Sequence, residues 1–79
     1  MKLPRDIDAA TLKQMPLPLG YTVTRQTGSH LRLTTQKQGQ HHITIPNHRP
    51  IKVGTLNSIL RDIAEHLRLS RDELLDQIL

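Results

Sequence analysis

Residues 21–45 read YTVTRQTGSHLRLTTQKQGQHHITI, and in three runs of this segment an apolar side chain recurs at every second position. Such alternation is typical of β-strands that bury one face. We therefore expect three strands, at residues 21–26, 30–34 and 42–45. Two segments with turn-forming residues separate the runs, namely Thr27-Gly28-Ser29 and residues 36–40 with Gly39. The segment thus predicts a three-stranded antiparallel meander.

The alternation divides the expected sheet into an apolar face and a polar, cationic face. The apolar face would carry Tyr21, Val23, Leu31, Leu33, Ile43 and Ile45. The polar face would carry Thr22, Thr24, Gln26, His30, Arg32, Thr34, His42 and Thr44. Such a sheet needs helices on its apolar side and leaves the polar side free to bind a ligand.

Helices are predicted on both sides of the strand segment. Asp8 can cap a first helix over residues 9–15, which the prolines at positions 16 and 18 should end. A long helix is indicated by the helical spacing of Leu56, Ile59, Leu60, Ile63, Ala64 and Leu67. A short last helix over residues 70–79 should begin with a capping box between Ser70 and Glu73.

The start of the long helix allows two interpretations. Gly54-Thr55 should open it, and we favour capping as the role of these two residues. The free N–H groups of a helix start can also hold an anion, and Lys52 would strengthen such a site.

Together the elements predict an α+β fold: helix, three-stranded antiparallel sheet, helix and a short extra C-terminal helix. A chain of 79 residues is too short to divide between two cores, so we expect a single domain over residues 1–79 with its core at residues 3–67. The apolar side of residues 70–79 could pack on its own domain or on a second copy, which would form a homodimer.

Charge is distributed unevenly along the chain. All seven acidic residues lie outside residues 9–61, whereas that range holds seven Lys and Arg residues and four of the five histidines. Such a surface attracts phosphates. No run approaches the roughly 20 apolar residues of a membrane span, and the N-terminus lacks the apolar region of a signal peptide. We therefore expect a cytoplasmic protein.

Composition excludes several classes of function. The absence of cysteine removes disulfides, thiolate zinc sites and cysteine nucleophiles. Tyr21 is the only aromatic residue, which argues against platforms that stack single-stranded bases on aromatic rings. His41 and His42 are adjacent, so on a strand they point to opposite faces and cannot both hold one metal ion. We expect no metal and no cofactor.

Four short motifs follow one another along the chain: Gly20-Tyr21, RQTGSH at 25–30, ITIP at 43–46 and VGTLNSIL at 53–60. In order and spacing they resemble the HicA family of toxins, over about residues 3–67. The resemblance implies a compact relative of the double-stranded-RNA-binding domain that cleaves messenger RNA as the toxin of a type II toxin-antitoxin system. It also implies that His30, in the Gly-Ser-His motif, is catalytic, and that the protein partner is a HicB-type antitoxin.

Histidine suits the cleavage of RNA, because it can accept the proton of a 2′-hydroxyl and return one near neutral pH. We predict that His30 is the general base or acid of a metal-independent endoribonuclease, with Arg25 and Arg32 as phosphate contacts. Gly28 would allow the turn to form, and Ser29 would offer its hydroxyl or N–H group to phosphate. Gln26, Lys37 and Lys52 complete the predicted RNA-binding set.

Two other histidines have weaker interpretations. His48, on a proline-flanked loop, could be an accessory acid or a phosphate contact. His66 suits the end of the long helix because a cation is favourable there.

Two other classes of function remain open on the sequence alone. The same sheet face could belong to a non-catalytic module that binds double-stranded RNA or DNA, or to an interaction protein that meets an acidic partner. A His30→Ala variant that binds RNA without cleaving it would favour the enzyme, whereas a parent protein that binds without cleaving would favour the module.

Overall fold

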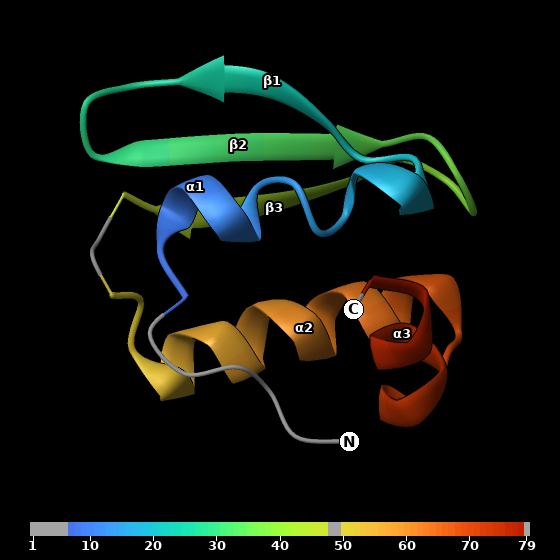
Figure 1. The fold of residues 1–79 in the computed structure, drawn as a ribbon. Coiled ribbons are helices and arrows are strands. Elements are labelled where there is room, and N and C mark those ends of the chain that lie inside the picture. The colour runs from blue at the N-terminus through green and yellow to red at the C-terminus, as the bar shows by residue number, and fades with distance from the viewer. Residues whose placement is uncertain (1–6, 48–49, 79) are drawn as a thin grey trace.

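Three strands form one antiparallel sheet in the order β1-β2-β3. The computed structural model describes residues 7–47 and 50–78, and its elements follow the predicted order (Figure 1). They are α1 (Ala9–Leu12), a 3₁₀ helix (Leu17–Leu19), β1 (Thr22–Gln26), β2 (His30–Thr35), β3 (His41–Pro46), α2 (Val53–Leu67) and α3 (Arg71–Ile78). The predicted α+β architecture is confirmed.

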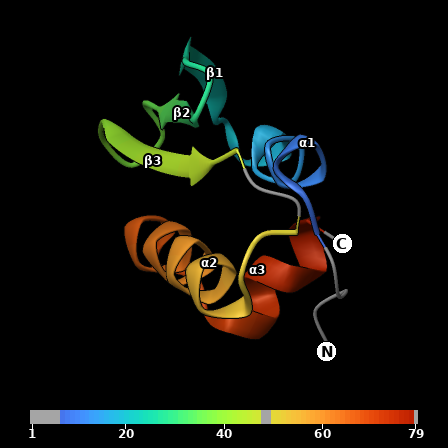
Figure 2. The ribbon, with the colours of Figure 1, turned by 90° about the vertical axis from the view of Figure 1, so that its left-hand side faces the viewer.

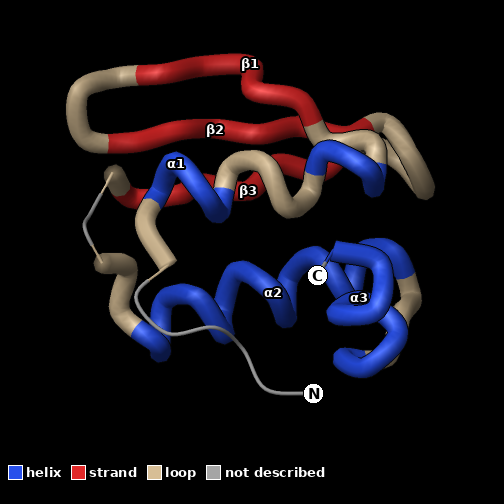
Figure 3. The backbone as a smooth tube through the Cα atoms, in the orientation of Figure 1, coloured by secondary structure: helices blue, strands red, loops and turns tan. Residues whose placement is uncertain are grey.

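The helices lie on one side of the sheet. Figure 1 shows α2 running beneath the strands, and the view turned by 90° in Figure 2 places α1 on the same side. Figure 3 shows α2 and α3 in blue below the red strands, with α1 in front of β3 in this view. In the described ranges, no helix combines the length and apolarity that crossing a bilayer requires.

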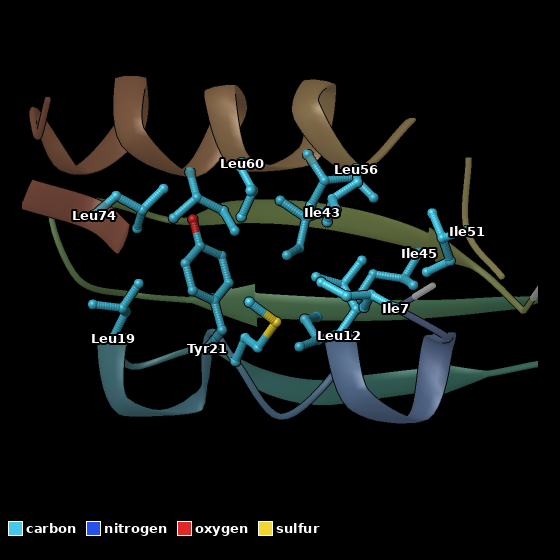
Figure 4. Close-up of a cluster of buried hydrophobic side chains, with 14 of the residues drawn as sticks. Ile7, Leu12, Leu19, Tyr21, Ile43, Ile45, Ile51, Leu56, Leu60 and Leu74 are labelled. Atoms are coloured by element: carbon cyan, nitrogen blue, oxygen red, sulfur yellow. The ribbon is translucent and has the colours of Figure 1, made fainter. Parts of the chain in front are cut away.

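The core fills the space between sheet and helices (Figure 4). Five of the six side chains predicted to face inward are buried: Tyr21, Leu31, Leu33, Ile43 and Ile45. Val23 shares the helix side of the sheet with its partner Leu33, as predicted, but its side chain is 43% exposed. Strand β1 is an edge strand, and the helices pack mainly against β3 on the far edge, so little lies over Val23.

Helix α1 is shorter than predicted. Its cap is confirmed, since the backbone N–H of Thr11 donates to Asp8 Oδ1 at 2.9 Å. The α-helix ends at Leu12, and the chain up to Met15 continues with tighter hydrogen bonds between residues three apart. The helical conformation is disfavoured just before a proline, which explains why the helix does not reach Met15.

Helix α2 begins before the predicted position. Lys52 occupies the N-cap without a side-chain hydrogen bond, so the predicted capping by Gly54 and Thr55 is wrong. The backbone N–H of Ile51 donates to the carbonyl of Ile7 at 2.8 Å, and the Ile51 side chain is buried. This contact sets the direction of the chain, and the helix starts two residues later.

Helix α3 packs on its own chain. The predicted capping box is present, since Ser70 N donates to Glu73 Oε1 at 2.9 Å and Glu73 N donates to Ser70 Oγ at 3.1 Å. These hydrogen bonds lower the pKa of Glu73. Leu74 and Leu75 are fully buried against the rest of the chain, mainly α2 and the 3₁₀ helix, so the apolar side of α3 is covered within the chain.

Candidate active site

Strand β1 carries one residue more than the part of β2 that it pairs with. Val23 pairs with Leu33 and Arg25 pairs with Arg32, so Thr24 and Arg25 together lie opposite a single residue. Such a β-bulge reverses the alternation of side chains beyond it. Arg25 therefore reaches the face of the sheet that points away from the helices.

We call this face the outer face. Its side chains come from all three strands: Thr22, Thr24, Arg25, His30, Arg32, Thr34, His42 and Thr44. Gln26, predicted on the same face, pairs instead with buried Leu31. Directly paired residues share a face of the sheet, so Gln26 lies on the helix side, and its predicted position is wrong because of the bulge.

The bulge brings two like charges together. Arg25 and Arg32 are direct cross-strand partners, and both are exposed. Like charges directly opposite each other on a sheet are destabilising unless an anion lies between them. Guanidinium groups match the geometry of phosphate, so this pair favours a bound phosphate over an empty site.

A hollow opens on the outer face beside this pair. It measures about 230 Å³ and is lined by Arg25, Thr27, His30, Arg32 and Thr44. None of these five side chains is acidic. A larger hollow of about 340 Å³ lies between α2 and α3, but leucines and charges of both signs line it. The smaller hollow therefore has the better chemistry for a phosphate.

His30 stands at the start of β2 with its imidazole exposed. Its Nδ1 lies 3.0 Å from Ser29 Oγ. The turn is held by Thr27, whose N–H donates to the His30 carbonyl at 2.9 Å and whose Oγ1 accepts from the His30 N–H at 3.1 Å. The ring is thus held close to the turn through Nδ1.

A residue beyond β3 also holds this turn. The Asn47 N–H donates to the Ser29 carbonyl at 2.9 Å, and Asn47 Nδ2 donates to the Gly28 carbonyl at 3.2 Å. Gly28 itself does not adopt a positive φ, and a Cβ added there would meet nothing within 4 Å. The turn therefore does not need glycine for its conformation, contrary to the prediction, and the bare backbone leaves space above it.

Two of the predicted RNA contacts lie away from the hollow. Lys37 sits in the turn between β2 and β3, at the opposite end of the sheet from His30. Lys52 begins α2 in the helical layer. The structure therefore brings together Arg25, Arg32, Ser29 and Gly28 around His30, and leaves Lys37 and Lys52 apart.

His41 and His42 point to opposite faces, as expected of strand neighbours. His42 lies on the outer face, where its Nδ1 is 2.7 Å from Thr34 Oγ1. His41 lies on the helix side, where its Nδ1 is 2.8 Å from the hydroxyl of Tyr21. In the described part of the chain, no three His, Cys, Asp or Glu side chains gather as a metal site would require. His48 lies outside the described residues.

His41 belongs to a helix-side cluster with Tyr21 and His66. The His41 and His66 rings are stacked with centroids 4.3 Å apart, and His66 Nε2 lies 2.9 Å from the Lys37 carbonyl and 3.0 Å from that of Gly39. Burial raises the pKa of Tyr21 to about 12, with Asp62 adding to the effect. Burial and the neighbouring His66 lower the pKa of His41, an effect that Asp62 opposes. The cluster fastens α2 to the turn between β2 and β3.

Sequence reasoning missed several residues of the site. Thr27 and Thr44 line the hollow and Asn47 holds the turn. Thr44 was placed on the correct face without a role. The position of Asn47 directly after a predicted strand was the available signal, since asparagine there can bond an adjacent turn.

These features define a small α+β protein with a cationic sheet face and an exposed histidine beside a hollow that no acidic side chain lines. The family model of the HicA toxin of bacterial toxin-antitoxin systems matches residues 9–64. The chain therefore belongs to the HicA toxin family. Comparison with curated proteins and with solved structures gives no match, so the likeness to the double-stranded-RNA-binding domain stays a prediction.

Proposed function

We propose that this HicA toxin is an endoribonuclease that cleaves messenger RNA on the outer face, with His30 as general base or acid. The observation that carries the proposal is the hollow in which an exposed imidazole meets two guanidinium groups and two hydroxyls. Phosphate recognition and proton transfer thus fall within one small space. Membership of the HicA family supports the same activity.

The chemistry follows from the groups in the hollow. The 2′-oxygen of a ribose attacks the adjacent phosphorus, and its proton passes to His30 Nε2 while Nδ1 stays bonded to Ser29. The bond from phosphorus to the 5′-oxygen breaks, and that oxygen takes up a proton from solvent water as it leaves. Arg25 and Arg32 stabilise the negative charge that builds on the phosphate oxygens.

These two cations supply the charge that a metal ion supplies in other nucleases. The enzyme should therefore cleave RNA in the presence of EDTA. Excess EDTA that abolished cleavage by the purified protein would contradict this part of the proposal.

The central experiment compares the parent protein with His30→Ala on a short RNA. We expect cleavage to fall by at least about 100-fold while RNA binding persists. Arg32→Ala should weaken both, and Arg61→Ala is a matched control, because it removes the same charge from the exposed surface of α2. A parent protein that binds RNA without cutting it would instead indicate a non-catalytic binding module.

The same face would also be the target of a HicB-type antitoxin. An acidic partner that covers Arg25, His30 and Arg32 would block RNA and relieve the repulsion between the two guanidinium groups. The charge-matched Arg25→Ala and Arg61→Ala variants test this point, since only the first should weaken the complex. A messenger RNA substrate and an antitoxin partner both imply that the protein acts inside the cell, which is part of this proposal.

A further inference from the structure

The outer face carries a second polar feature, away from the hollow. Thr24 Oγ1 lies 2.8 Å from Thr34 Oγ1, and Thr34 Oγ1 lies 2.7 Å from His42 Nδ1. Thr24 Oγ1 also donates to the carbonyl of Arg32 at 3.4 Å. One side chain from each strand thus forms a hydrogen-bonded chain across the sheet. Its middle member, Thr34, is only 7% exposed, although it lies on the outer face.

We infer the direction of this chain from its Thr24 end. The Arg32 carbonyl oxygen can only accept, so we assign the single proton of the Thr24 hydroxyl to the 3.4 Å contact with that carbonyl and leave Thr24 Oγ1 as the acceptor in the 2.8 Å contact with Thr34. Thr24 Oγ1 must then accept the proton of the Thr34 hydroxyl. Thr34 has no second proton to give, so its oxygen accepts from His42 Nδ1–H. In the neutral ring this leaves the lone pair on Nε2 of His42.

His42 therefore presents a hydrogen-bond acceptor to the solvent on an otherwise cationic face. A phosphate oxygen is also an acceptor and cannot pair with it. The donor that every ribonucleotide carries, and that DNA lacks, is the 2′-hydroxyl. The bulge residue Thr24 is essential to this arrangement, because its hydroxyl sets the direction of the whole chain.

The position of His42 separates it from the reacting phosphate. Thr34 is four residues beyond His30 on β2, and His42 is paired with Thr34 on the next strand. At about 3.3 Å per residue, the separation along the strand is roughly 13 Å. One phosphate cannot lie within hydrogen-bond reach of both imidazoles. His42 thus meets a different nucleotide from the one that is cleaved.

We propose that His42, oriented by Thr34 and Thr24, is a subsite that accepts a hydrogen bond from the 2′-hydroxyl of a nucleotide other than the scissile one. This inference rests on the proposed ribonuclease function and adds to it a means of selecting RNA over DNA away from the reacting bond. His42 is a binding residue in this scheme and takes no part in proton transfer.

The first test needs no RNA. Nitrogen-15 NMR of the imidazole rings should show the proton of neutral His42 on Nδ1. In Thr34→Val, which keeps the shape of the side chain but removes its hydroxyl, this preference should be lost. A His42 ring protonated on Nε2 in the parent protein would overturn the proposal, whatever the protein does to RNA.

The second test measures the binding of short RNAs in the His30→Ala background, so that no substrate is cleaved. Each 2′-hydroxyl is replaced in turn by hydrogen. One replacement, outside the scissile nucleotide, should weaken binding roughly three- to tenfold, and His42→Ala should lose the same factor and become insensitive to that replacement. Equal sensitivity of both proteins at every position would overturn the subsite while leaving the ribonuclease intact. Failure to bind any RNA would overturn both.

Discussion

His41 and His42 are neighbours in the sequence, yet they belong to opposite sides of the sheet and to different kinds of environment. His41 is half-buried, stacked on His66 and bonded to Tyr21, in a cluster that fastens a helix to a turn. His42 is exposed and lies on the face that carries His30 and the arginine pair. Under the proposed function, histidine serves stability on one face of this sheet and chemistry on the other.

The difference follows from the surroundings of each face: the helix side excludes water, and the hollow of the outer face has no acidic side chain. On the helix side the rings exchange water for protein partners, and burial disfavours the charged form of His41. On the outer face the cations lie exposed around a hollow in which no side chain is acidic. A variant on the helix side should therefore leave RNA cleavage nearly unchanged, and a variant on the outer face should leave stability nearly unchanged.

The largest expected effect separates the two faces directly. His30→Ala should reduce RNA cleavage by about 10²- to 10⁴-fold, because it removes the group that moves the proton. Its melting temperature should stay within about 2 °C of the parent, since the side chain is exposed. His41→Ala should show the reverse, with a lower melting temperature and nearly intact cleavage. Equal losses of cleavage in the two variants would refute the division.

The arginine pair gives the next effect. Arg25→Ala should reduce cleavage by roughly 10²-fold, as expected for the loss of one preorganised contact to developing charge. The same variant should be as stable as the parent or slightly more so, because it relieves the repulsion with Arg32. Kinetic assays paired with urea unfolding measure both, and a clear loss of stability would show that the two guanidinium groups do not repel each other.

Tyr21→Phe probes the helix-side cluster. It removes the hydroxyl that lies 2.8 Å from His41 Nδ1 and keeps the buried ring. We expect the free energy of unfolding to fall by about 1–2 kcal/mol, because a partly buried nitrogen loses its partner. Denaturant unfolding measures this value. Thr27→Val, which removes a hydroxyl from the outer face, is the comparison for cleavage, since only that variant should affect it.

The smallest effect is the response to pH. The fold lowers the pKa of His41 below its ordinary value of 6.5, so the unfolded chain takes up this proton more readily. The free energy of unfolding should therefore be greatest above pH 6.5 and decline as the pH falls through that value towards the lowered pKa. Thermal unfolding at a series of pH values measures the decline, and His41→Gln should flatten it.

Stability should also decline at alkaline pH, and the cause there is a raised pKa. The fold raises the pKa of Tyr21 from 10.0 to about 12, so this contribution to stability is complete below pH 10 and is lost between those two values. Tyr21→Phe should lack the alkaline decline. A parent and variant that lose stability in parallel above pH 10 would assign the decline to another group.

Local patterns in the sequence were sufficient to predict the elements and their order. The strands, the Asp8 cap and the Ser70–Glu73 capping box each depend on residues close together in the chain, and all are confirmed. The errors arise where distant residues decide. Val23 is exposed because no helix covers the edge strand, and the start of α2 is set by the contact of Ile51 with Ile7.

The candidate site was predicted only in part for the same reason. The Gly-Ser-His motif located His30, and the distribution of charge indicated the arginines. The bulge at Thr24 has no local signature in an alternating run, so the sequence assigned Gln26 to the outer face in place of Arg25. The contact of His66 with the turn carbonyls joins segments that are almost thirty residues apart, beyond the reach of any periodicity.

Deletion of the extra residue in β1 would separate the hydrogen-bonded chain of Thr24, Thr34 and His42 from the arginine pair. Val23 and Arg25 keep their partners on β2 whether or not Thr24 is present, so a chain shortened by this one residue would regain an uninterrupted ladder. Its guanidinium pair would stay in place, while Thr34 would lose the neighbour that takes its proton. Shortening a strand by one position would thus keep the cleavage site and remove the recognition of a second 2′-hydroxyl away from it.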